Sequence, residues 1–209
     1  HNSQLGLAAQ QARLLGTSKY SSTQLSQEMY KIGMSYSVSV GQKETSVLLS
    51  GLTSQLDTSF KLLNHILTDL KANQEVTRGL IQKTLQLREN AIKNPRGLLW
   101  NGLQNYAVYG KSSPLMDQLS NKGLKTLESE ELLSDFQHIF EYSPQILFYG
   151  ESNQKDIKSI ISSSNLIAGT KLKSPEMNYL RREMKETKIT ILDYDLKTSE
   201  ILLLSKGTT

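Results

Sequence analysis

Apolar residues at the start of the chain recur every three to four positions, with polar residues between them. The repeating set is Leu5, Ala8, Ala9, Ala12 and Leu15. This spacing puts all of its members on one side of an α-helix, so it predicts a helix with one face packed against other parts of the protein. Gly16 follows directly, where glycine often ends a helix. We therefore expect an opening helix that is buried along one stripe and capped at Gly16.

Several later stretches show the same helical period. They cover about residues 23–32, 55–70, 73–93, 98–109, 129–139 and 154–162. Ser22 or Thr23 is the expected N-cap of the first of these helices, and Thr53 or Ser54 that of the second, because short hydroxyl side chains accept hydrogen bonds from free backbone N–H groups. The chain is thus predicted to be rich in helices.

The longest predicted helix runs from Asn73 to about Lys93. Asn73 is a favourable N-cap residue, and Glu75 lies near the positive end of the helix dipole. Pro95 is expected to end the helix, because proline cannot continue the hydrogen-bonding pattern. The expected buried stripe consists of Leu80, Thr84, Leu87 and Ala91.

The hydrophobic pattern changes to strict alternation over Ser35–Val40, and Thr45–Ser50 follows after a short polar turn. This pattern predicts a β-hairpin. A compact apolar run at residues 145–150 predicts a further strand, and residues 187–194 and 199–205 predict a second hairpin. Helices and strands together predict an α+β fold, mainly an antiparallel sheet with several helices packed on it.

The same patterns divide the chain into three parts. Residues 1–162 hold the elements of one domain, residues 163–187 predict a linker because Ser, Gly and mixed charges dilute the pattern, and residues 188–209 hold the second hairpin. An isolated hairpin is only marginally stable in water. We therefore expect it to pair with this domain, with a second copy or with a domain outside the chain.

Composition narrows the function classes. The chain has 209 residues, of which 37% are hydrophobic and 21% charged, as expected for an ordinary globular protein. The net charge of +4 is dispersed rather than clustered, which argues against nucleic-acid binding. The chain has no cysteine, so it can form neither disulfides nor thiolate metal sites. No apolar run reaches the roughly 20 residues that a membrane span needs.

Short segments in order along the chain resemble the pitrilysin/insulinase family of zinc metallopeptidases. They are Leu14-Leu15-Gly16-Thr17, Tyr20-Ser21, residues 25–33, Leu49-Ser50-Gly51-Leu52, Leu99-Trp100, residues 106–110 with Ser113-Pro114, and residues 146–150. The similarity covers roughly residues 5–150 and looks like the third repeat of a long bacterial insulinase-like peptidase. No single motif carries it.

The resemblance implies an architecture. In that family, four similar α/β repeats form two halves that close around a chamber, with the zinc in the first repeat and the third and fourth repeats in the non-catalytic half. Residues 188–209 resemble the opening hairpin of the fourth repeat. The first strands of the third repeat would precede His1, so we expect this repeat to be truncated at its N-terminus.

The resemblance also implies where a catalytic motif would lie. Active repeats carry H-x-x-E-H four residues before Gly-Thr. Counting back from Gly16-Thr17, the three positions hold Leu7, Gln10 and Gln11. Glutamine has a neutral amide and cannot act as a general base, so the motif is degenerate.

The family's third zinc ligand would fall near Leu87 to Glu89. A lone Glu89 facing Leu7 and Gln11 is no metal site, and we expect it to be a solvated helix residue. We therefore expect no catalytic residue, no metal ligand and no cofactor in this chain, and zinc in the catalytic half of the parent protein.

Other residues that could act in metal binding or peptide binding have less support for such roles. His65 and His138 lie on separate predicted helices, without a neighbouring histidine or acidic spacing, and are expected to be surface or boundary residues. Trp100, Tyr106 and Tyr109 could line a peptide-binding chamber, although the more ordinary interpretation is that all three rings are core residues.

Two functional hypotheses follow. In the first, the chain is a fragment of the non-catalytic half of an insulinase-like zinc peptidase, which completes the chamber and helps to bind peptide. Its partners would be the catalytic half, in the same or another polypeptide, the peptide substrate and possible further copies bound through the C-terminal hairpin. In the second, the family member is a structural or assembly subunit without peptidase activity. The resemblance favours a periplasmic or cell-envelope location.

Overall fold

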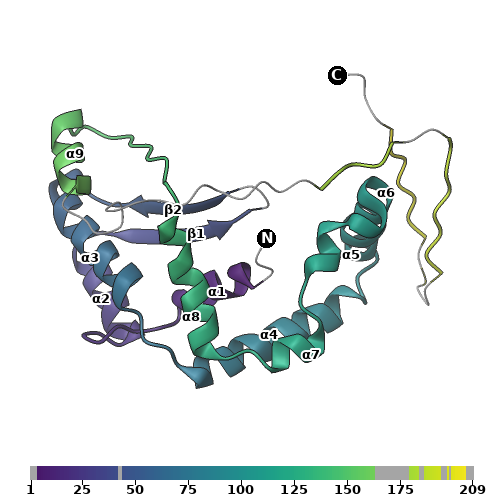
Figure 1. Cartoon of the computed structure of the whole chain (residues 1–209), viewed down its shortest axis with the longest axis horizontal. Helices are drawn as coiled ribbons and strands as arrows, with labels where there is room; N and C mark the ends of the chain where they lie inside the picture. The colour runs from purple at the N-terminus through teal and green to yellow at the C-terminus, as the bar shows by residue number, and fades with distance from the viewer. Residues whose placement is uncertain are drawn as a thin grey trace.

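The computed structural model describes residues 4–41, 44–162, 179–183, 186–193, 197 and 199–205. The first half of the fold contains α1 (Leu5–Ala12), α2 (Ser22–Lys31), β1 (Ser35–Val40), β2 (Thr45–Ser50), η1 (Thr53–Gln55), α3 (Leu56–Asp69) and α4 (Gln74–Ala91). The second half contains α5 (Pro95–Gly97), η2 (Leu98–Leu103), α6 (Gln104–Tyr109), η3 (Gly110–Ser112), η4 (Pro114–Asp117), α7 (Asn121–Lys125), α8 (Ser129–His138), η5 (Ile139–Glu141) and α9 (Gln154–Ser162). Helices packed with a small antiparallel sheet form an α+β fold, as predicted (Figure 1).

The opening helix α1 is the central element of the core. Its inner face is buried as the sequence predicts, and it packs between β1 and α8 and against α4 (Figure 1). The predicted cap at Gly16 is wrong, because the helix ends at Ala12 with Arg13 as its C-cap. Gly16 is needed for space instead: a Cβ atom there would lie 2.6 Å from the carbonyl oxygen of Tyr20.

The hairpin of β1 and β2 has the predicted residues and is antiparallel, with Ser35 opposite Ser50 and Val40 opposite Thr45. Most of its apolar side chains face the core, whereas Leu48 is exposed on the other side. The core-facing side chains are Tyr36, Val38, Val40, Val47 and Leu49, all partly buried against the core. The core itself contains Phe136, Leu132, Leu124, Ile66 and Leu67 among its most buried side chains. The sheet therefore covers one side of α1, and α8 covers another.

The caps of α2 and α3 differ from the prediction. Ser21, rather than Ser22 or Thr23, caps α2: its hydroxyl accepts from the N–H of Gln24, whose side chain accepts from the N–H of Ser21. The start of α3 has no side-chain cap, since a turn of 3₁₀ helix precedes it and tightens its first residues.

Helix α4 begins at the predicted N-cap, since the side chain of Asn73 accepts from the N–H groups of Glu75 and Val76. Only its first half is buried, through Thr77, Leu80 and Ile81. The predicted stripe is wrong at Leu87, which is 58% exposed, and at Ala91, which is also exposed. Figure 1 shows the reason, because α4 leaves the core and extends toward α5 and α6.

The next helical run starts earlier than predicted. Asn94 caps it by accepting from the N–H of Gly97, and Pro95 occupies the first helical position, where its missing N–H costs nothing. The run passes through a π-helical segment, η2, into α6 and ends at Gly110, whose φ of +64° favours glycine. Within it Leu99 is buried, whereas Trp100 and Tyr106 are 49% and 43% exposed.

Two predicted strand regions are not strands. Residues 145–150 form an exposed loop between η5 and α9, and the described parts of the second hairpin, 187–193 and 199–205, contain no strand either. A strand needs a neighbour to satisfy its backbone groups. The sheet in the described residues consists of β1 and β2 alone, and neither region is paired with it. The turn of the second hairpin and most of the predicted linker lie outside the described residues, and the three-part division remains a prediction.

No helix within these ranges is long and apolar enough to cross a bilayer.

The position of α8 in the core gives a test of the fold. Phe136 is fully buried and packs edge to face on Phe140, with ring centroids 5.7 Å apart. We expect Phe136→Ala to lower the free energy of unfolding by about 3–5 kcal/mol, because it removes buried apolar surface and leaves a cavity. Urea unfolding followed by circular dichroism measures this. The control Leu87→Ala, at an exposed position, should change stability by less than about 0.5 kcal/mol, and an equal loss in both variants would contradict the core assignment.

Candidate functional site

Gln11, which the family resemblance would place at the second motif histidine, is buried in the core. It lies on the inner face of α1 and is 1% exposed. Its side-chain Nε2 donates to the carbonyl oxygen of Ser129, at 3.0 Å, and to the hydroxyl oxygen of the same residue, at 2.8 Å. Ser129 is the first residue of α8, so Gln11 ties the centre of one helix to the start of another.

Ser129 is the hub of a larger, partly buried network. Its hydroxyl also accepts from the N–H of Asn73, at 2.8 Å, and its own N–H donates to Oε1 of Gln74, at 2.7 Å. The Nε2 of Gln74 donates in turn to the carbonyl oxygen of Leu127, at 3.2 Å. These bonds join α1, the start of α4 and the start of α8 in the core, where unpaired polar groups would be costly.

The residues at the other two motif positions are less buried than Gln11. Leu7 is partly buried against the core, and Gln10 is exposed. Glu89, at the place of the third ligand, is on the exposed part of α4 and pairs with Lys93 at 3.0 Å, as expected for a solvated residue. Sequence reasoning thus placed Glu89 in its correct environment.

These residues do not fit zinc. A peptidase zinc takes about three strong protein ligands, whereas Leu7 offers none and the Gln11 amide nitrogen is committed to Ser129. The one available atom is Oε1 of Gln11, which is buried without a hydrogen-bond partner among the described residues. A single amide oxygen is a weak ligand for zinc. Across the described ranges, no group of three His, Cys, Asp or Glu side chains could hold a metal ion.

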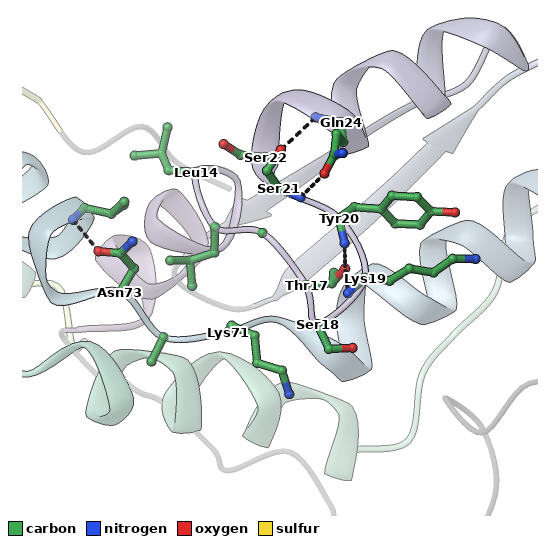
Figure 2. A pocket seen from close by; sticks show the side chains of 14 residues that line it. Leu14, Thr17, Ser18, Lys19, Tyr20, Ser21, Ser22, Gln24, Lys71 and Asn73 are labelled. Carbon is green, nitrogen blue, oxygen red and sulfur yellow. Dashed lines mark hydrogen bonds between the residues drawn. The ribbon is translucent and has the colours of Figure 1, made fainter.

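A polar hollow lies beside this network, between the α1–α2 loop and the segment joining α3 to α4 (Figure 2). Its volume is about 500 Å³, and it is open to solvent. The N-termini of α2 and α4 both border it, but Ser21 and Asn73 already accept hydrogen bonds from their free N–H groups, as the dashed lines in Figure 2 show. The capping groups at these two helix starts are therefore already hydrogen-bonded within the chain.

The loop on one side of this hollow is fastened to the end of α3. The N–H of Ser18 donates to a carboxylate oxygen of Asp69 at 3.0 Å, the Ser18 hydroxyl donates to the same oxygen, and Nζ of Lys71 lies 3.2 Å from the other. The Ser18 hydroxyl, followed by Lys71, lowers the pKa of Asp69 to about 2. An isolated β-bridge between Thr17 and Leu70 completes the junction.

Thr17, His65 and Asp69 have the residue types of a nucleophile, a base and an orienting acid, but their geometry is structural. Thr17 Oγ1 lies 3.0 Å from His65 Nε2, and it also accepts from the N–H of Tyr20 at 3.1 Å. The distance from His65 Nδ1 to Asp69 is 3.9 Å, too long for a hydrogen bond. The hydroxyl is also largely buried, so the arrangement gives no support to acyl transfer.

Sequence reasoning missed both acidic neighbours of the histidines. Asp69 follows His65 by one helical turn, and Glu141 follows His138, with its carboxylate 2.9 Å from His138 Nδ1. The i, i+4 and i, i+3 spacings were the available signal. No comparable signal could have identified Ser129 as a hub, since its partners are far away in sequence.

The three aromatic candidates for a chamber lie on a different part of the molecule from α1. Trp100 and Tyr106 are partly exposed on η2 and α6, so the interpretation that they are core residues is wrong. Tyr109 packs edge to face on Tyr179, with ring centroids 6.4 Å apart. Whether any of the three lines a chamber stays a prediction.

Comparison with solved structures shows the fold. A structure of the ferredoxin protease FusC in complex with Arabidopsis ferredoxin matches 86% of this chain with a TM-score of 0.68 and 16% identity. The periplasmic protease PqqL from Escherichia coli matches 87% with a TM-score of 0.65 and 13% identity, and a protease from Helicobacter pylori matches 88% with a TM-score of 0.57 and 12% identity.

The chain spans 20% of the FusC chain, 21% of PqqL and 45% of the Helicobacter pylori protease. No protein-family model and no curated protein matches the sequence. The protein therefore shares its fold with parts of longer proteases.

The Gln11 network predicts a stability effect at a motif position. We expect Gln11→Ala to lower the free energy of unfolding by about 1–3 kcal/mol, because it removes two buried hydrogen bonds to Ser129. Urea unfolding measures this. The adjacent variant Gln10→Ala changes an exposed side chain and serves as the control, with an expected effect below about 0.5 kcal/mol. A Gln11→Ala variant as stable as the control would show that the network contributes nothing.

The lowered pKa of Asp69 predicts acid sensitivity. Because the folded pKa is about 2 and the reference value is 3.8, the stabilisation is present above pH 3.8 and is lost as the pH falls toward 2. We expect Asp69→Asn and Ser18→Ala each to reduce the pH dependence of unfolding in this window. Thermal unfolding at a series of pH values measures it, and a slope equal to that of the unaltered chain would contradict the assignment.

Proposed function

We propose that this chain is part of the non-catalytic half of an insulinase-like zinc metallopeptidase, where it completes the proteolytic chamber and helps to bind peptide. The single observation that carries the proposal is the environment of the Gln11 side chain. At the position of a zinc ligand, this side chain is buried and donates both of its amide N–H groups to Ser129.

The fold and the size of its neighbours support this proposal. FusC and PqqL are proteases, and the chain matches about a fifth of each of them. A repeat that has given up its own zinc site can still act as a wall of a chamber, since that role requires packing and shape rather than metal ligands. The zinc and the general base would then belong to a catalytic half in the same or another polypeptide.

Peptide binding and location belong to the proposal as well. The partly exposed rings of Trp100 and Tyr106 would supply apolar surface for a bound peptide, since aromatic side chains offer large contact area with little loss of conformational freedom. We place the parent protein in the periplasm or cell envelope, where PqqL works. The alternative, a structural subunit with no peptidase partner, predicts no H-x-x-E-H sequence in the parent reading frame or a neighbouring one.

The proposal predicts that the chain alone neither binds zinc stoichiometrically nor cleaves peptides. Elemental analysis after equilibration with zinc and removal of the excess measures binding, and incubation with a labelled unstructured peptide measures cleavage. We expect well under one zinc per chain, because fewer than three protein ligands are available, and no cleavage above a buffer control. One tightly bound zinc together with chelator-sensitive turnover would overturn the proposal.

A further inference from the structure

Hydrogen-bonding groups that have no partner within α6 meet in a corner at the C-terminal end of this helix. The last carbonyl groups of a helix have no partner within it, and the carbonyl of Val108 is one of them. Gly110 follows in a left-handed conformation and is buried. The short helix η4 then brings the carboxylate of Asp117 to the same place, and Ser113 caps η4 by accepting from the N–H of Leu115.

A distant part of the chain occupies this corner. The N–H of Arg182 donates to the carbonyl oxygen of Val108 at 2.8 Å. The hydroxyl of Tyr179 donates to the carboxylate of Asp117, and its ring packs edge to face on Tyr109. In Figure 1 the C-terminal part of the chain accordingly lies beside α6. One side chain and one backbone group of a single short segment thus meet complementary groups.

Gly110 shapes the corner for this segment. A Cβ atom on Gly110 would lie 2.9 Å from Cδ, 3.1 Å from Nε and 3.3 Å from Cζ of Arg182. The arginine side chain therefore lies in space that only glycine leaves open. Any other residue at position 110 would also be strained by the φ of +64°.

We propose that this corner is a peptide-docking site that recognises an extended segment with a tyrosine and, three residues later, an arginine, and that residues 179–183 are its occupant. The phenol hydroxyl donates to Asp117, the arginine lies over Gly110, and the arginine N–H caps α6. Leu180, between them, is 78% exposed, so the site does not select for the side chain at this position. This inference does not depend on the proposed function.

The charges and the protonation state of the site agree with this assignment. The hydrogen bond to Asp117 and partial burial raise the pKa of Tyr179 to about 12, so the hydroxyl stays a donor at neutral pH. A carboxylate acceptor makes this a charge-assisted bond, which is stronger than one between neutral groups. Phenylalanine could reproduce the ring contact but not this bond.

The C-terminal region makes a second contact with this end of the molecule. Glu200 lies 3.6 Å from Nε of Arg96 on α5, so a second point of the C-terminal region also contacts this end of the molecule. Ile189 and Ile191 lie between the two contacts and are strongly exposed.

Limited proteolysis of the full chain tests the docking. Trypsin cleaves the bond between Arg181 and Arg182, and the amide of that bond is the one that donates to Val108. We expect Tyr179→Phe and Asp117→Asn each to accelerate this cleavage about three- to tenfold. The double variant should be cleaved no faster than the faster single variant, because both changes remove the same hydrogen bond. The matched control Asp156→Asn, at the start of α9, should leave the rate unchanged.

Binding in trans gives a second test that does not depend on one variant. A labelled peptide with the sequence of residues 177–188 should bind the full-length double variant Tyr179→Ala/Arg182→Ala, whose own segment is released, at least about tenfold more tightly than it binds the unaltered chain. The same peptide with Tyr179→Phe should bind more weakly. Excess unlabelled peptide should also accelerate cleavage of the unaltered chain. Unchanged cleavage rates in the variants together with no difference in peptide binding would overturn the proposal.

Discussion

The buried hydrogen bonds around Ser129 are the constraint on which the arrangement of the core depends. A polar side chain in an apolar interior is tolerated only when its hydrogen-bonding groups find partners. The Nε2 group of Gln11 donates to Ser129, which in turn accepts from Asn73 and donates to Gln74, whereas Oε1 of Gln11 has no partner among the described residues. Because these groups come from three helices, each helix can satisfy its buried polar atoms only in one register relative to the other two.

This network links α1 to α4 and α8 through side-chain hydrogen bonds. In a zinc repeat, the ion would link ligands on separate helices and contribute directly to their packing. Here the Gln11 amide supplies a link from α1 to α8 with ordinary hydrogen bonds. The fold that contains this link is similar to parts of FusC and PqqL.

The apolar segments without partners lie outside this core. Leu147 and Tyr149 are almost fully exposed, although their composition is typical of a buried strand. The docking of residues 179–183 shows the opposite case, in which a segment with mixed charge and no helical or strand pattern is placed by specific contacts. Periodicity describes what a segment could bury, whereas the neighbours present decide whether it does.

The sequence alone determined the elements whose stabilising groups are local. The hairpin of β1 and β2, the cap at Asn73 and the end of α6 at Gly110 follow from alternation, a capping side chain and a glycine, all read within a few residues. The α+β class follows from those elements.

Only the tertiary structure decided the remaining features, because they depend on groups far apart in the chain. The partner of Gln11 lies 118 residues away, so no local pattern could show that its amide is committed to Ser129. Leu87 has the right spacing for a buried stripe but lies beyond the part of α4 that reaches the core, and residues 145–150 have the composition of a strand but no paired neighbour. Gly16 looks like a helix cap, yet close approach to Tyr20 requires it. Burial and pairing are properties of two surfaces, and a sequence pattern describes only one of them.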